Sequence, residues 1–192
     1  MAFLEQPAFE IGRRIEIRGG NTWVVVLGPD TTNDSIAGFI ADLSASLSRT
    51  VRVVTGAGSM DGLLTALASP ADDPVLIADL DGVDAEAWSA LDINRSGLAR
   101  EGAVILWLSS YGLANLSRSA PNLRSFVGGS IFPLSPDGST LTPEERASRI
   151  AELEDHFRMT SEQAIAQAVA GTQPSDPLFV EWLVLLDRGD LV

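Results

Sequence analysis

Lysine and cysteine are both absent from this chain of 192 residues, which contains 13 arginines, one histidine (His156) and one tyrosine (Tyr111). Without cysteine the chain has no thiol nucleophile, no disulfide and no thiolate metal site. Without lysine it can form no Schiff base and can place no ammonium group on a phosphate. A single histidine leaves only carboxylate-rich metal sites. These absences exclude most of the common catalytic chemistries.

Positive charge is scarce as well. The chain has 26 acidic residues against 13 basic ones, and its net charge is −13. Such a surface repels phosphate backbones and anionic lipids, so we expect neither nucleic acid nor membrane as a partner. The N-terminal residues lack a basic leader followed by an apolar run, and no stretch approaches about 20 apolar residues. We therefore expect a cytoplasmic protein.

Apolar β-branched runs alternate with helical patterns along the first part of the chain. The runs cover residues 23–27, 51–55, 74–78, 104–108 and 130–134, and the helical patterns cover 33–49, 60–68, 84–99 and 111–118. Strands that alternate with helices in this way indicate a mostly parallel sheet with helices on both faces. We expect an α/β domain over residues 1–136, in which the alternating segment Arg13–Arg18 forms an N-terminal edge strand.

The chain changes character after residue 136, where no further β-branched run follows. Thr142 with Glu145 and Thr160 with Gln163 have the spacing of capping boxes, and Ser175-Asp176-Pro177 offers a third helix start. Residues 137–192 hold eleven acids and four arginines, a net charge of −7. We expect an acidic appendage of short helices, too small to fold alone, that docks on the first domain or on another chain.

Two loops after apolar strands carry polar side chains. Gly28 to Ser35 spans eight residues between a strand and a helix, the frame of a phosphate-binding loop, with Gly28 and Ser35 at matching positions. The run Val75–Asp79 ends in a carboxylate, and Ser109-Ser110 follows the strand after it. Ligands of parallel sheets bind beyond the carboxyl ends of the strands, so these loops mark the place for a site.

In this order the motifs resemble those of a degenerate P-loop NTPase domain of the additional-strand kind, as in AAA+ and STAND ATPases, over residues 20–135. The resemblance implies that Ser35 is the metal-side hydroxyl, Asp79 the magnesium carboxylate and Ser109 a sensor. Asn33 stands where the second glycine belongs, and Asp34 stands where the phosphate-binding lysine belongs. Because that lysine neutralises the phosphates, this departure from the family pattern predicts that hydrolysis is lost, and we expect no cofactor.

Structural roles compete with these assignments. Asp34 suits the first turn of a helix, where its charge complements the helix dipole. The acids Asp79, Asp81 and Asp84 could hold Mg²⁺ or Ca²⁺, or Asp81 could form a turn and Asp84 could cap the next helix. The tryptophans Trp88, Trp107 and Trp182 fall within apolar patterns typical of a core.

The sequence favours a non-enzymatic pseudo-NTPase scaffold that binds another protein, and the resemblance implies kinship with accessory subunits of bacterial signalling or defence assemblies. Aromatic anchors surrounded by charge are typical of interface hot spots. We therefore expect a partner with a basic surface at Phe179, Trp182, Leu186, Glu152, Asp155 and Glu162, although Trp182 also suits a helix that seals the sheet. The alternative is a nucleotide- or magnesium-binding switch that uses the loop Gly28–Ser35 and Asp79.

Overall fold

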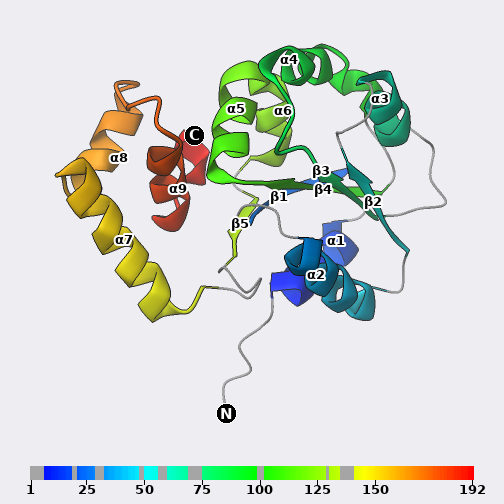
Figure 1. Cartoon of the computed structure of the whole chain (residues 1–192), viewed down its shortest axis with the longest axis horizontal. Coiled ribbons are helices and arrows are strands. Elements are labelled where there is room, and N and C mark those ends of the chain that lie inside the picture. The colour runs from blue at the N-terminus through cyan, green and yellow to red at the C-terminus, as the bar shows by residue number, and fades with distance from the viewer. Residues whose placement is uncertain are drawn as a thin grey trace.

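The computed structural model of the chain describes residues 7–18, 21–28, 33–47, 50–55, 60–68, 75–98, 102–128, 130–134 and 141–192. Within these residues, five parallel strands form one sheet in the order β2-β3-β4-β1-β5 (Figure 1). The strands are β1 (Thr22–Leu27), β2 (Val51–Thr55), β3 (Val75–Asp79), β4 (Ala103–Leu108) and β5 (Ile131–Pro133). The predicted α/β class with a parallel sheet is confirmed.

Helices cover both faces of the sheet (Figure 1). Alternate side chains of a strand point to opposite faces, so Val24 and Val26 pack with α1 (Pro7–Arg18) and α2 (Asn33–Ser46). Trp23, Val25 and Leu27 belong to the apolar cluster on the other face. The helices on that face are α3 (Met60–Ala68), α4 (Ala85–Ile93), α5 (Ser110–Ser119) and α6 (Pro121–Val127).

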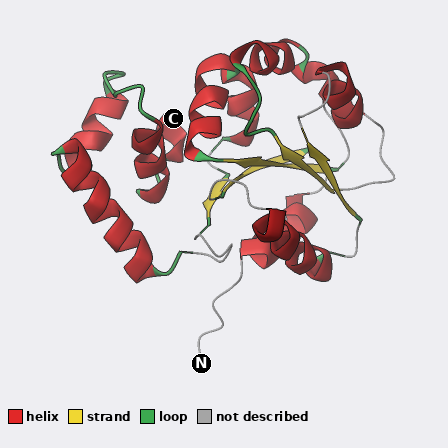
Figure 2. Cartoon of the chain, in the orientation of Figure 1, coloured by secondary structure: helices red, strands yellow, loops and turns green. Residues whose placement is uncertain are grey.

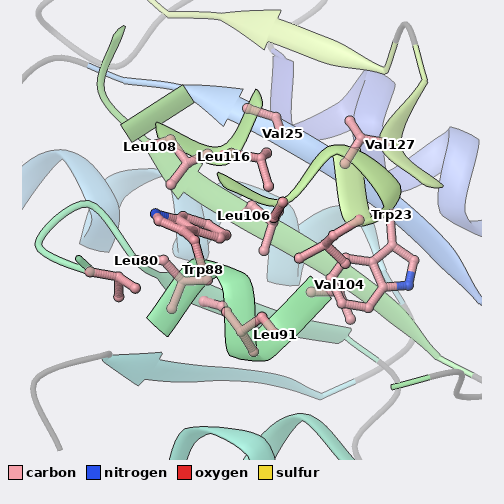
Figure 3. Packing of buried hydrophobic residues seen from close by; sticks show 14 of the residues in the cluster. Trp23, Val25, Leu80, Trp88, Leu91, Val104, Leu106, Leu108, Leu116 and Val127 are labelled. Carbon is pink, nitrogen blue, oxygen red and sulfur yellow. The ribbon is translucent and has the colours of Figure 1, made fainter. Parts of the chain in front are cut away.

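The larger apolar cluster lies between α4, α5, α6 and the sheet. Figure 3 shows Trp88 and Leu91 of α4 grouped with Val104 and Leu106 of β4. All four side chains are fully buried, and burial of one such side chain contributes about 1.5–3 kcal/mol. The predicted core positions of Trp88, Trp107 and Trp182 are confirmed, because each is 0% exposed.

The predicted edge strand at Arg13–Arg18 is wrong, because this segment belongs to helix α1. Ala8, Ile11 and Ile15 are buried at spacings of three and four residues, which is a helical period. Six residues that alternate between charged and apolar side chains fit both the period of a strand and that of a helix. The spacing of the buried residues over the longer segment shows that it is a helix. A Cβ at Gly12 would overlap the Ser46 hydroxyl, so α1 and α2 approach closely at this glycine.

Two helices on the upper face of Figure 1 differ from the expected pattern. The helix predicted over 84–99 ends at Ile93 and is followed by a short 3₁₀ helix, Arg95–Leu98. Helix α6 was not predicted. Its buried Arg124 donates hydrogen bonds to the carbonyl oxygens of Gly128 and Gly189, which joins α6 to the second 3₁₀ helix, Gly189–Leu191, near the C-terminus.

The C-terminal segment forms three helices, α7 (Pro143–Phe157), α8 (Ser161–Val169) and α9 (Pro177–Leu185). The capping boxes predicted at Thr142 and Thr160 are both confirmed. Asp176 caps α9 by accepting a hydrogen bond of 2.9 Å from the amide of Leu178. No helix in the described part of the chain is both long and apolar enough to cross a bilayer.

The three C-terminal helices have an apolar cluster of their own. The Phe157 ring stacks on Trp182, with centroids 5.6 Å apart, and Phe179 packs edge-on to both rings. Helix α9 also contacts α5 and β5, and its Val184 belongs to the cluster on the sheet. Figure 2 shows these helices beside the edge of the sheet that carries β5. The segment is therefore docked along α5 and β5 through α9.

Candidate functional site

A cavity of about 670 Å³ lies at the carboxyl edge of the sheet, between the strand ends and the C-terminal helices. Its volume falls within the range of about 300–1,000 Å³ typical of ligand sites. The ends of β1 and β5, the start of α5, helix α7 and helix α9 all contribute to its lining. The lining residues are Leu27, Gly28, Ser109, Ser110, Tyr111, Pro133, Leu134, Leu141, Glu145, Ser148, Arg149, Glu152, Pro177, Leu178, Glu181 and Leu185.

Helix α7 supplies the charged wall of the cavity. Glu145, Ser148, Arg149 and Glu152 line it at spacings of three, one and three residues, which places them on one face of the helix. The polar face of α7 therefore lies across the cavity from the carboxyl ends of β1 and β5. The cavity is acidic on balance, since three glutamates and one arginine line it.

Arg149 is already engaged by carboxylates. Its Nε donates to Glu181 Oε1 at 2.7 Å, and its NH1 group donates to Glu152 Oε2 at 2.9 Å. Hydrogen bonds to Glu181 raise the pKa of Arg149 above its ordinary value against the opposing effect of burial, and Glu152 adds to the rise. Glu181 also accepts a hydrogen bond of 3.0 Å from the Ser110 hydroxyl. One network thus connects α5, α9 and α7.

Ser109, the predicted sensor, lies in the cavity wall, and both its amide and its hydroxyl proton are used in hydrogen bonds within the protein. Its backbone amide and hydroxyl both donate to Asp81 Oδ1, at 2.7 and 2.5 Å. The hydroxyl also caps α5 by accepting from the amide of Gly112 at 3.2 Å. A Cβ at Gly112 would overlap Asp81 Oδ1. The Asp81 carboxylate therefore rests on the N-terminus of α5, where the helix dipole favours a negative charge.

The three acids near β3 do not converge on a metal. In the described residues no group of three or more histidines or acids is placed to hold an ion. Asp84 caps α4 by accepting from the amide of Ala87 at 2.8 Å, as the structural alternative predicted, and Asp81 lies in a turn with Gly82. Asp79 is not among the residues that line the cavity.

Asp79 itself is half-buried at the end of β3. Its Oδ1 accepts a weak hydrogen bond of 3.4 Å from the amide of Asp81. Burial raises the pKa of the Asp79 carboxyl, the amide of Asp81 lowers it, and repulsion from the Asp81 carboxylate raises it. The net effect is a raised pKa, so the folded protein disfavours the ionised form of Asp79.

The predicted phosphate loop is described only at its two ends. Gly28 is buried, and its amide donates to the Leu108 carbonyl at 3.0 Å. A Cβ there would lie 2.8 Å from the Trp107 indole, so only glycine fits against this ring. Residues 29–32 and the side chains of Asn33, Asp34 and Ser35 lie outside the described residues, and the backbone of α2 begins at Asn33.

Two of the predicted partner contacts are wrong. Phe179 and Trp182 are each 0% exposed, because they form the core of the C-terminal helices together with Phe157. They have no surface to offer a partner, and Leu186 packs half-buried against the same cluster. The carboxylates Glu152, Asp155 and Glu162 are exposed, so a role for them in attracting a partner stays a prediction.

The residues that sequence reasoning missed are Arg149 and Glu181, whereas Ser110 was noted beside Ser109. The spacing of Glu145, Arg149 and Glu152 along α7 was visible in the sequence, but it marks one helix face without showing what that face covers. No protein-family model and no curated protein matches this chain. The assignment of function therefore depends on the geometry of the site.

Proposed function

We propose that this chain is a non-catalytic pseudo-NTPase module, a P-loop-like domain that acts as a scaffold for another protein. The strand order supports the proposal. Strand β4 lies between β1, which ends at Gly28, and β3, which ends at Asp79. A strand inserted between the phosphate-loop strand and the carboxylate strand is the additional strand from which that class of NTPase takes its name.

The negative charge of the cavity is the main observation in favour of the proposal. A nucleotide held by the loop after β1 would lie at the carboxyl edge of the sheet, where three glutamates and one arginine line the cavity. That arginine, Arg149, is already bonded to Glu181 and Glu152. The chain contains no lysine that could supply the missing positive charge. Repulsion between carboxylates and phosphates in a partly desolvated cavity costs several kcal/mol as an order of magnitude.

The occupation of Ser109 supports the same conclusion. A sensor hydroxyl must be able to bond to the ligand, whereas this hydroxyl donates to Asp81 and caps α5. Asp81 takes the place at this helix end that an anionic ligand could otherwise fill. A ligand that displaced the Asp81 carboxylate would break its two hydrogen bonds with Ser109 at the start of α5.

The scaffold role requires a partner, which we place at the acidic C-terminal helices. Glu152, Asp155 and Glu162 are exposed on α7 and α8 and would attract a basic surface over a distance of about 8–10 Å at moderate salt. Charges of this kind steer association more than they hold the complex together. In this proposal the protein is an accessory subunit of a cytoplasmic bacterial signalling or defence assembly.

The alternative function is a nucleotide- or magnesium-binding switch. The position of Asp79 at the end of β3 favours it, because this carboxylate would face a metal bound by the loop after β1. A melting scan with millimolar Mg²⁺ and either ATP or GTP separates the two functions, since a ligand stabilises the state that binds it. We expect an unchanged melting temperature. A rise that is lost in Asp79→Asn would contradict the scaffold and support the switch.

A further inference from the structure

The cavity combines an apolar surface with an acidic rim. Leu27, Pro133, Leu134, Leu178 and Leu185 supply apolar side chains from three different elements. Glu145 and Glu152 lie seven residues apart on the face of α7 that lines the same cavity. An occupant that fits both surfaces needs an aliphatic portion and a positively charged end, as arginine and lysine side chains have.

The carboxylates that line the cavity are only partly neutralised by its one arginine. Arg149 forms ion pairs of 2.7 Å with Glu181 and 2.9 Å with Glu152. Glu145 accepts one hydrogen bond from the backbone amide of Thr142. Because this amide is uncharged, it does not neutralise the carboxylate. The three glutamates and the one arginine therefore give the lining a net charge of −2. A ligand with two positive charges would neutralise it, and a ligand with one would halve it.

Tyr111 adds an aromatic surface at the same place. It lines the cavity at the start of α5 and is 61% exposed, whereas all four tryptophans are buried. A guanidinium or ammonium group over such a ring gains about 0.5–1 kcal/mol at an exposed site. Its position is independent of the acidic face of α7, and both features favour a cation.

We infer that this cavity receives an arginine or lysine side chain from a basic, extended segment of a protein partner. The inference rests on the proposed scaffold function and names the point at which the partner enters. The aliphatic stem lies along Leu134 and Leu178, and the charged end reaches Glu145 and Glu152 beside Tyr111. Among the described residues, the lining holds no basic side chain except Arg149, which is already paired with Glu181 and Glu152.

The test is an amide-resolved NMR titration with a capped tetrapeptide that has two central arginines. The matched probe carries citrulline in place of arginine, which keeps the shape and removes the charge. We expect the arginine peptide to shift the amides of Ser109, Tyr111 and Arg149 and to bind about tenfold more tightly than the citrulline peptide. Equal binding of the two peptides, or no binding of either, overturns the inference.

Variants with equal charge separate the cavity from the general acidity of the protein. Glu145→Gln with Glu152→Gln removes two charges from the cavity, and glutamine preserves the capping box, as Gln163 does in α8. Glu144→Gln with Glu86→Gln removes two exposed charges, on α7 and α4, that do not line the cavity. We expect about tenfold weaker peptide binding in the first pair and less than about twofold in the second.

Each result has a distinct meaning. Equal weakening in both pairs would overturn the cavity assignment and would leave the scaffold function standing, because the acidic surface would still attract the peptide. Saturable binding of spermidine as tight as that of the peptide would replace the partner segment with a free amine and would also overturn it. Failure of the scaffold function is seen separately, as stabilisation of the wild-type protein by Mg²⁺ with ATP or GTP.

Discussion

The carboxylate of Asp81 accepts two hydrogen bonds from Ser109, one from the backbone amide at 2.7 Å and one from the hydroxyl at 2.5 Å. These residues follow neighbouring strands, β3 and β4, and lie 28 positions apart in the chain. Their contact ties the turn after β3 to the first turn of α5. It also places a negative charge of the protein at a helix start that faces the cavity.

Ser109→Ala removes both the helix cap and one donor to Asp81, so we expect a loss of about 1–2 kcal/mol in the free energy of unfolding. Asp81→Ala is expected to cost about 1–3 kcal/mol. Because both substitutions remove the same hydroxyl contact, the double variant should lose less than the sum, with a coupling of about 1 kcal/mol. Urea unfolding of the four proteins measures this cycle. Additive losses would show that the contact contributes nothing to stability.

Two glycines within helices should respond in opposite ways to alanine. Gly112→Ala places a methyl group against Asp81 Oδ1 and 3.2 Å from Leu108 Cδ2, so we expect a loss of about 1–3 kcal/mol. Gly38, within α2, has no atom within 4 Å of an added Cβ, and alanine there should stabilise by about 0.5–1 kcal/mol. Thermal unfolding measures both. A Gly112→Ala variant as stable as wild type would contradict the position of Asp81. In an Asp81→Ala background, Gly112→Ala should destabilise the protein less.

Asp79→Asn should stabilise the protein at neutral pH. The raised pKa of Asp79 means that its ionised form opposes folding. This penalty is present above the folded pKa, declines as the pH falls through it, and is absent below the unfolded value of 3.8, where both states are protonated. Unfolding curves at several pH values should therefore converge for the two proteins in acid. The exposed Asp155→Asn is the control, expected to stay within about 0.5 kcal/mol of wild type.

If Asp79→Asn stabilises the protein equally at neutral and at acidic pH, the gain comes from packing and not from the removed charge. If the variant is less stable than wild type at neutral pH, the ionised carboxylate of Asp79 does not oppose folding.

The regular parts of the fold could be predicted because their causes are local. The β-branched runs bounded by turn residues marked the strands, and the caps at Asp84, Thr142 and Thr160 lie within three residues of the amides they satisfy. The edge strand at 13–18 was wrong because a short alternation fits two periods. The longer spacing of Ile11 and Ile15 was the available helical signal.

The site could be predicted only in part, since its contacts join distant residues. The position of Ser109 at the carboxyl edge followed from the strand pattern, but its bond to Asp81 depends on how two loops meet. Arg149 and Glu181 are 32 positions apart and pair only because α7 packs beside α9. Trp182 lies on a short apolar helix, where one sequence pattern fits both a core and an interface, and packing assigns it to the core.

If residues 28–35 adopt the shape of a phosphate-binding loop, replacing the two residues that depart from its pattern should create affinity for nucleotide. Asn33→Gly with Asp34→Lys supplies the missing glycine and the missing charge, while the start of α2 supplies backbone amides. A nucleotide at ten times its Kd stabilises the protein by about 1.4 kcal/mol. We expect the melting temperature of the double variant to rise with Mg²⁺ and ATP. An unchanged melting temperature would show that residues 28–35 do not form a phosphate site.

We expect the cavity at the carboxyl edge of the sheet to reject nucleotide. An NMR titration of the wild-type protein with Mg²⁺ and ATP, followed at the amides of Gly28, Ser109, Ser110 and Arg149, measures this at the cavity itself. Because carboxylates line the cavity and its one arginine is already paired, we expect no saturable shift at millimolar nucleotide. Saturable shifts at these amides, with Arg149 released from Glu181, would contradict this expectation and would assign the protein to the switch.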